Sequence, residues 1–206
     1  MTVWLCRLAW SHHRSGTESQ GLAGMAATST PASPVEDIAA WQRQHPSGSS
    51  QPLTPDLVAF AQRGVSVIMA APGANGRPAP GIAVGCRIAQ DGSMRILLGR
   101  AGNVALLEAV GAGAGLAVTF TAAPDHRSFQ VKTSHAEIRP ATSDDLPEMD
   151  RQTACFMDDL LELGFPPELA RGYVAFDPAD LIAIEFLPDR VFTQTPGPGA
   201  GAELKR

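Results

Sequence analysis

The stretch VSVIMAAPGANGRPAPGIAVGCRI, residues 65–88, decides the fold class. Val65 to Ala71 is an apolar run that contains β-branched residues, and such a run is typical of a buried strand. The dipeptide Asn75-Gly76 then favours the tight turn of a β-hairpin. We therefore expect a return strand from about Ala79 to Ile88, antiparallel to the first.

Further strands are expected toward the C-terminus. Asp91-Gly92 is a second hairpin signal, and the strand Met94 to Leu98 follows it. Four more runs predict strands: Leu116 to Thr121, Ser128 to Ile138, Leu181 to Phe186 and Arg190 to Gln194. Strands and helices do not alternate regularly, so a Rossmann sheet is not expected. Six or seven strands with a few helices predict an α+β barrel.

Four helices are expected before and between these strands. Thr54-Pro55 is a cap followed by a first-turn proline, which begins a helix. Asp144 or Asp145 begins the longest helix, and Gly164 ends it. Two shorter helices are expected, from Asn103 to Val110 and from Val35 to Arg43.

Composition divides the chain into three parts. Residues 1–52 are rich in Ser, Thr, Gly, Gln and Pro and show no sustained hydrophobic period, so we expect a disordered leader. Met25 leaves open a natural start within this segment. Residues 53–195 are expected to form one domain, and the Pro/Gly-rich residues 196–206 a flexible tail.

Charge limits the classes of partner. The net charge of -5 argues against a general nucleic-acid binder. Residues 63–139 nevertheless hold eight Lys/Arg against four Asp/Glu, whereas residues 140–206 hold five against thirteen. A basic middle region allows a cleft to attract a small anion although the whole chain is acidic.

Cysteine usage and hydropathy give the expected compartment. The three cysteines are far apart and form no CxxC pair, which predicts a reducing compartment and no zinc site. No apolar run approaches the ~20 residues of a membrane-spanning helix. We therefore expect a cytoplasmic protein with no membrane partner, although the short apolar segment Val3 to Trp10 leaves a targeting sequence as an alternative.

Spacing alone identifies no catalytic residues and no metal site. The chain has no GxSxG, HExxH or P-loop motif, and Gly111 to Gly115 lacks the strand-to-helix context of a dinucleotide site. His126 and His135 are nine residues apart and are interpreted as ordinary polar positions, with a metal-binding pair as the alternative. The catalytic residues are left unassigned.

Six residues are candidates for binding an anionic cofactor. Arginine binds phosphate with two donors, lysine is a point charge, and a helix start at Asn103 adds free amides and a favourable dipole. Gln130 can donate to and accept from a heterocycle edge, and it shares one strand face with Lys132. The candidates are Arg87, Arg100, Asn103, Arg127, Gln130 and Lys132. The alternative is that they are ordinary surface residues.

The order of these elements resembles the pyridoxamine 5'-phosphate oxidase-like family of FMN-binding split barrels. The resemblance lies in a strand ending near Arg87, then ILLG, the helix NVALLEAV, LAVTF and SFQVK, and in the ending EFLPDRVFTQTPGPGAG. It implies an antiparallel six- to seven-stranded split β-barrel in residues 53–195. It also implies a homodimer with FMN at the subunit interface.

Five of the six candidates look like that family's flavin-contacting positions: Arg87, Arg100, Asn103, Gln130 and Lys132. Arg127 is what this chain retains of an Arg-rich start of the strand that holds Gln130. The resemblance implies an oxidoreductase that transfers hydride between FMN and a small organic substrate. The substrate stays unassigned, because the chain closes on a Pro/Gly stretch where the pyridoxamine phosphate oxidases have a basic, histidine-containing motif. Two alternatives on the same fold are a non-catalytic flavin or haem binding or sensor protein, and a deazaflavin-dependent reductase.

Overall fold

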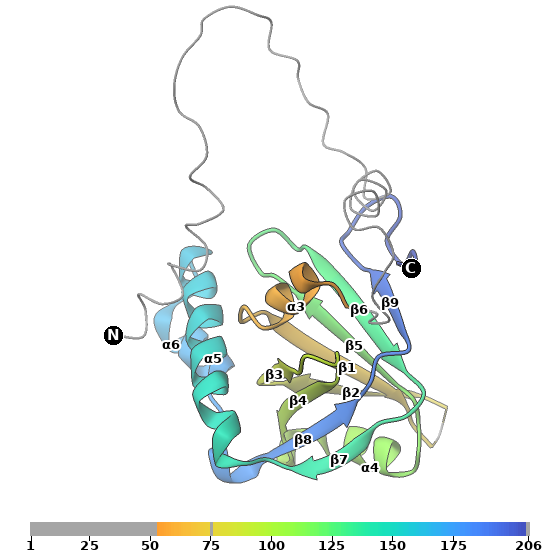
Figure 1. Ribbon diagram of the computed structural model, residues 1–206. Coiled ribbons are helices and arrows are strands. Elements are labelled where there is room, and N and C mark those ends of the chain that lie inside the picture. The colour runs from red at the N-terminus through yellow and green to blue at the C-terminus, as the bar shows by residue number, and fades with distance from the viewer. Residues whose placement is uncertain (1–52, 75, 205–206) are drawn as a thin grey trace, which may run out of the picture.

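Two antiparallel sheets form the core of the computed structural model, which describes residues 53–74 and 76–204 (Figure 1). The first sheet has the order β2-β1-β5-β6-β9 and the second β3-β4-β8-β7. The strands of the first sheet are β1 (Ser66–Pro72), β2 (Pro78–Ala83), β5 (Leu116–Thr121), β6 (Ser128–Thr133) and β9 (Arg190–Thr193). Those of the second are β3 (Gly85–Ile88), β4 (Met94–Gly99), β7 (Glu137–Pro140) and β8 (Leu181–Phe186).

The predicted α+β antiparallel fold class is confirmed, but the described residues form nine strands where six or seven were expected. Two predicted strands are each divided between the sheets. The run Ala79 to Ile88 bends at Val84 into β2 and β3, and Ser128 to Ile138 divides into β6 and β7. No strand of one described sheet pairs with a strand of the other, so the barrel is open rather than closed.

The core lies between the inner faces of the sheets. Val67, Met69, Val118 and Phe120 alternate along β1 and β5 and are at most 1% exposed. This is the period of two that a half-buried strand requires. Phe120 stacks on Phe129 of β6 with ring centroids 4.9 Å apart. The inward residues of the two sheets therefore form one continuous apolar cluster.

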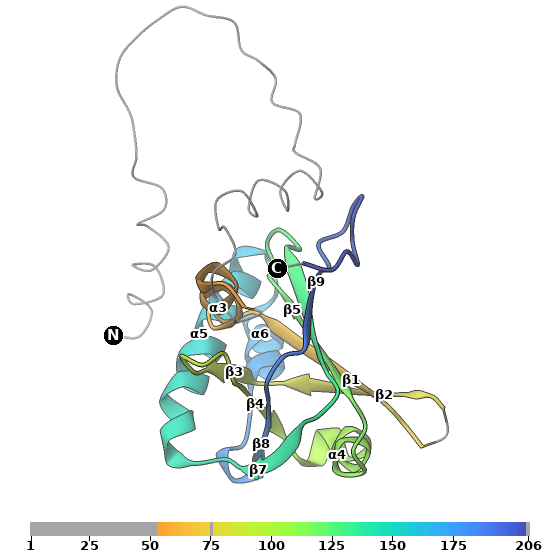
Figure 2. The ribbon, with the colours of Figure 1, turned by 45° about the vertical axis from the view of Figure 1, so that its right-hand side comes forward.

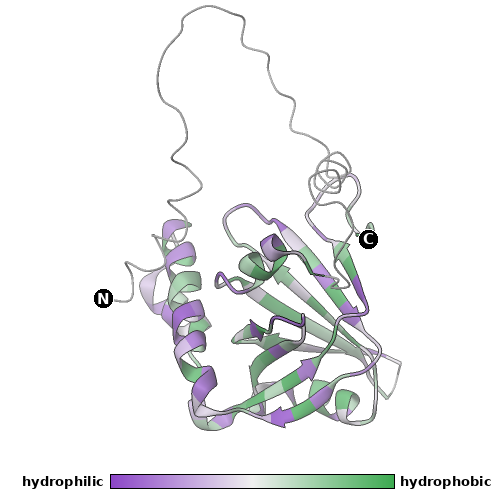
Figure 3. Ribbon diagram, viewed as in Figure 1, coloured by the Kyte–Doolittle hydropathy of each residue, from purple (hydrophilic) through white to green (hydrophobic). Residues whose placement is uncertain are grey.

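Four helices flank the sheets in the described part of the chain: α3 (Pro55–Ala61), α4 (Val104–Gly111), α5 (Leu146–Glu162) and α6 (Pro167–Val174). The predicted cap of α3 is present, because the Leu57 amide donates to Thr54 Oγ1 at 3.3 Å. Figure 3 shows hydrophilic and hydrophobic residues alternating along α5, as expected for a helix with one buried face. Helix α6, which packs on α5, was not predicted.

The predicted tail folds back instead of leaving the domain (Figure 2). The Gly201 amide donates to the Thr193 carbonyl at 2.7 Å, and the Leu204 amide donates to the Val191 carbonyl at 2.8 Å. Gly197, Gly199 and Gly201 have positive φ angles, and these allow the reversal. The Pro/Gly composition therefore marked a turn that returns to β9. The expected leader, including Val35 to Arg43, lies outside the described residues.

Candidate flavin site

Gln130 and Lys132 both lie on the outer face of the five-stranded sheet, as predicted from their spacing. Gln130 is opposite Thr119 of β5 and Phe192 of β9, and Lys132 is opposite Ala117 and Arg190. Val131 between them is fully buried on the other face. The structure therefore places the two side chains on the surface, one pleat apart.

Gln130 is one end of a row of side chains that lie opposite one another on four neighbouring strands. Thr119 is opposite Ile68 of β1, and Ile68 is opposite Ile82 of β2. We call Ile82, Ile68, Thr119 and Gln130 the outer-face row. It carries no charge, and its two isoleucines are 59% and 48% exposed. Neighbouring strands are about 4.8 Å apart, so the row is about 14 Å long.

Polar contacts fix the β6 end of the row. Gln130 Nε2 donates to Thr119 Oγ1 at 2.9 Å, which orients the amide plane. Lys132 Nζ lies 4.7 Å from the centroid of the Phe192 ring, and the Arg190 guanidinium lies 4.8 Å from the same centroid. Lys132 therefore places a positive charge beside the uncharged row, whereas the Arg190 charge is paired with Glu203.

Asn103 and Arg100 lie at the β2 end. Asn103 is 6% exposed, and its Oδ1 accepts from the Ile82 amide at 2.9 Å. Its Nδ2 donates to the Gly99 carbonyl at 2.7 Å and to the Ile82 carbonyl at 3.2 Å. Asn103 therefore ties the turn after β4 to β2, and it makes no side-chain cap on α4. Arg100 is exposed and directly follows Gly99, the residue that Asn103 ties to Ile82.

Arg87 lies elsewhere. It is opposite Arg95, so it is separated from Arg100 along β4 by about 16 Å. Its Nη1 donates to Asp145 Oδ1 at 2.9 Å. The structure does not bring Arg87, Arg100 and Asn103 together around one anion. Arg127 is also separate: it is exposed in the loop before β6, with its guanidinium 4.9 Å from the Phe60 ring centroid.

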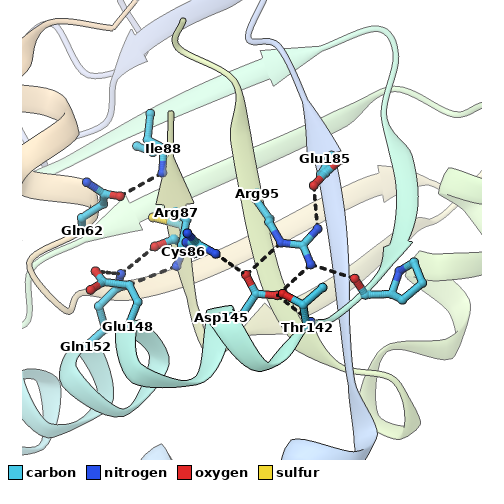
Figure 4. A network of polar contacts seen from close by, with 11 residues as sticks. Gln62, Cys86, Arg87, Ile88, Arg95, Thr142, Asp145, Glu148, Gln152 and Glu185 are labelled. Atoms are coloured by element: carbon cyan, nitrogen blue, oxygen red, sulfur yellow. Dashed lines mark hydrogen bonds and ion pairs between the residues drawn. The ribbon is translucent and has the colours of Figure 1, made fainter. Parts of the chain in front are cut away.

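Asp145 is the centre of a polar network between β4 and α5 (Figure 4). It is 0% exposed, and it accepts from Arg95, from Arg87 and from the Thr142 amide at 2.8 Å. Burial raises the pKa of the Asp145 carboxyl, but these hydrogen bonds outweigh burial and hold its pKa well below the usual 3.8. The sequence indicated Asp145 only as a possible start of the longest helix, and it did not indicate Arg95.

Gln152 of α5 completes the free edge of β3. Its Oε1 accepts from the Cys86 amide at 3.1 Å, and its Nε2 donates to the Cys86 carbonyl at 2.6 Å. The next amide on that edge is that of Ile88, and it donates to Gln62 Oε1 at 2.8 Å. Burial raises the pKa of the Cys86 thiol far above its usual value, so Cys86 is a packing residue and not a nucleophile.

A cavity of about 260 Å³ adjoins the β2 end of the outer-face row. Ser66 and Ile82 line it on the sheet side, and Phe156, Tyr173 and other residues of α5, α6 and the following segment line it opposite. Asp177 and Asp180 also face it. Sequence reasoning missed these residues because the segments are far apart in the chain and carry no motif.

The described residues also contain no cluster of three or more His, Cys, Asp and Glu side chains able to hold a metal ion. None of the helices in residues 53–74 and 76–204 is both long and apolar enough to span a membrane.

Comparison with known proteins finds neither a matching family model nor a matching curated protein. Solved structures similar to the chain include HupZ of Group A Streptococcus, with 13% identity, coverage of 72% of this chain and 99% of that one, and a TM-score of 0.45. A pyridoxamine 5'-phosphate oxidase-type protein of Lactobacillus delbrueckii has 16% identity, 68% and 93% coverage, and a TM-score of 0.42. An F420 reductase has 12% identity, 70% and 98% coverage, and a TM-score of 0.43. These likenesses concern the fold and assign no ligand to this chain.

Proposed function

We propose that this chain is an FMN-binding oxidoreductase whose flavin lies on the outer-face row of the five-stranded sheet. The observation that carries the proposal is the row itself: an uncharged and partly exposed row on one sheet face that ends at an oriented glutamine amide. Cofactor sites are mostly apolar with a few precisely placed polar groups, as this row is, and a second copy of the chain packed on the row would make the site concave. The proposal rests also on the resemblance of the sequence to the FMN-binding split barrels.

The residues at the β6 end fit the ring of a flavin. With Nε2 engaged by Thr119, Gln130 presents Oε1 as an acceptor for a ring N–H. The exposed Lys132, one pleat away, would put a positive charge beside the ring. Positive charge near a flavin favours its reduced, anionic form.

Near the β2 end, Arg100 is the one candidate whose side chain is available to bind a phosphate. Asn103 is fully engaged by Gly99 and Ile82, and Arg87 is engaged by Asp145 at the far end of β4. Arg100 is exposed, and Asn103 ties its neighbour Gly99 to Ile82, at the opposite end of the row from Gln130. A flavin with its ring at Gln130 and its phosphate at Arg100 would follow the row.

A second copy of the chain is the expected cover of this face. Ile68 and Ile82 are adjacent across β1 and β2 and both are about half exposed. An uncharged sheet face with exposed isoleucines loses unfavourable contact with water when a second copy packs on it. In this arrangement the protein positions the flavin and excludes water, and the flavin supplies the redox chemistry.

The first test is the visible spectrum of the full chain with FMN and with riboflavin, followed by titration of each. We expect saturable FMN binding with a spectrum that a reductant bleaches. Gln130→Ala should weaken binding of both flavins two- to tenfold, the cost of about one hydrogen bond. Gln90→Ala, in an exposed turn outside the row, is the matched control and should leave binding unchanged.

The second test concerns the cover. Ile68→Lys places a charge at the centre of the outer-face row, and sedimentation should show a dimer becoming a monomer with little change in melting temperature. A wild-type chain that binds no FMN removes the flavin proposal. A wild-type monomer that binds FMN removes the interface part alone. Unchanged FMN affinity in Ile68→Lys would show that the flavin does not lie on the outer-face row.

A further inference from the structure

The cavity beside the outer-face row has aromatic and aliphatic walls on two sides. Val65 and Ile82 form part of the sheet side. Phe156 of α5 and Tyr173 of α6 form part of the helix side, with their rings edge to face at 5.7 Å between centroids. Tyr173 lines the cavity and is 53% exposed, so part of its side chain is accessible to a ligand.

The remaining side of the cavity is acidic. Asp177 Oδ1 accepts from the Ala179 amide at 2.9 Å, and both Asp180 carboxylate oxygens accept from the Ala101 amide, at 3.2 and 3.1 Å. These bonds orient the carboxylates without neutralising their charge.

No Lys, Arg or His lines this cavity, and in the described part of the chain neither Asp177 nor Asp180 forms an ion pair. The nearby Arg100 donates its backbone amide to the Asp180 carbonyl, but its exposed side chain is not part of the lining. The cavity therefore combines two fixed negative charges with aromatic walls.

We infer that this cavity binds a small organic ammonium ion with an aromatic or aliphatic body. An ammonium group can donate charge-assisted hydrogen bonds to Asp177 and Asp180. The faces of Tyr173 and Phe176 attract a cation through their quadrupoles, and the apolar body would pack on Val65 and Ile82. A carboxylate or phosphate ligand would meet only negative charge.

The inference rests on the cavity and not on the flavin, so it is tested without flavin. The probe is phenethylamine, which is cationic at pH 7. It is added to the ¹⁵N-labelled full chain and followed by NMR at the Ala101 and Ala179 amides, because these donate to the two carboxylates. We expect saturable shifts with a dissociation constant on the order of 1 mM or tighter. The neutral 2-phenylethanol should bind about tenfold more weakly, and 3-phenylpropionate should not bind.

Variants separate the carboxylates from general surface charge. Asp180→Asn keeps the acceptor for Ala101 and removes the charge, so binding should weaken about three- to tenfold. Asp150→Asn, on the exposed side of α5, is the control and should have no effect. Ile82→Arg, at an exposed position of the cavity wall, should abolish binding by placing a cation beside the carboxylates even if Asp180→Asn does not fold.

Equal binding of phenethylamine and 2-phenylethanol would overturn the inference. So would the absence of shifts at Ala101 and Ala179, or an Asp180→Asn variant that binds as well as wild type. FMN binding without phenethylamine binding would reject this inference and leave the flavin proposal standing; the reverse result would reject only the flavin.

Discussion

Arg95 and Asp145 form a bidentate ion pair that joins β4 to the start of α5. Arg95 Nε donates to Asp145 Oδ1 at 2.9 Å, and Nη2 donates to Oδ2 at 2.7 Å. Arg95 also donates to Glu185 at 2.6 Å and to the Pro140 carbonyl at 2.7 Å. One guanidinium therefore connects three strands of the second sheet to the helix that covers them.

Removing the Asp145 carboxylate should destabilise the fold strongly. Asp145→Ala leaves the Arg95 guanidinium, whose side chain is 17% exposed, without its main partner. Breaking a buried pair in this way costs about 3 kcal/mol or more of the free energy of unfolding. Urea denaturation measures it, with the exposed neighbour Asp144→Ala as the control, which should change the free energy by less than about 0.5 kcal/mol. Similar values for the two variants would show that the pair contributes nothing.

The same pair predicts a loss of stability in acid. The folded pKa of Asp145 lies below the unfolded value of 3.8, so the folded state holds fewer protons than the unfolded state near that pH. Its contribution is present above about pH 4 and is lost as the pH falls through the folded pKa. Glu148 acts in the same direction, because hydrogen bonds from Arg151 and Gln152 outweigh its burial and lower its pKa. Asp159 acts in the opposite direction, because burial raises its pKa.

Urea denaturation of the wild type from pH 7 to pH 2.5 should therefore show stability falling most steeply below pH 4. In Asp145→Asn the fall below pH 4 should be shallower, since the group that releases the proton on folding is gone. An unchanged slope in this variant would place the acid sensitivity on other carboxylates.

Gln152 should control protection of the β3 edge. Gln152→Met keeps the side-chain volume but leaves the Cys86 amide and carbonyl without partners, at a cost of about 2 kcal/mol in the free energy of unfolding. Hydrogen exchange of the Cys86 amide should become faster. The Ile88 amide, bonded to Gln62, is the internal control and should keep its protection apart from the global change. Equal acceleration at both amides would show only general destabilisation.

The fold was largely predictable because its strands and caps are local signals. The hairpin β1–β2, the Thr54 cap and the end of α5 at Gly164 each follow from a few adjacent residues. The division of Ala79 to Ile88 and of Ser128 to Ile138 into two strands each was not predictable. Hydrophobic alternation along a strand does not indicate where the chain passes from one sheet to the other. Helix α6 was missed for a related reason: it is only eight residues long and begins at the second of two consecutive prolines.

The candidate site was predictable only within a strand. The spacing of Gln130 and Lys132 places them on one face whatever the topology. That Ile82, Ile68 and Thr119 continue the row depends on the register of four strands, which no local pattern contains. The partner of Arg87, Asp145, is 58 residues away in the sequence. Contacts across such separations follow from the folded topology alone.

Arg87 and Arg100 should respond differently to substitution, because only Arg100 stands at the end of the outer-face row. Arg100→Ala should weaken FMN about tenfold or more, since a charge-assisted contact to a phosphate contributes about 1.5–3 kcal/mol, and should weaken riboflavin much less because riboflavin has no phosphate. Arg87→Ala removes a donor to Asp145, so it should lower the melting temperature and leave both affinities nearly unchanged. Arg171→Ala, at an exposed position of α6, controls for the loss of one positive charge. Titration of all three variants with both flavins decides the matter. Equal losses for FMN and riboflavin in Arg100→Ala would place the phosphate elsewhere, and a phosphate-specific loss in Arg87→Ala would place it at the far end of β4.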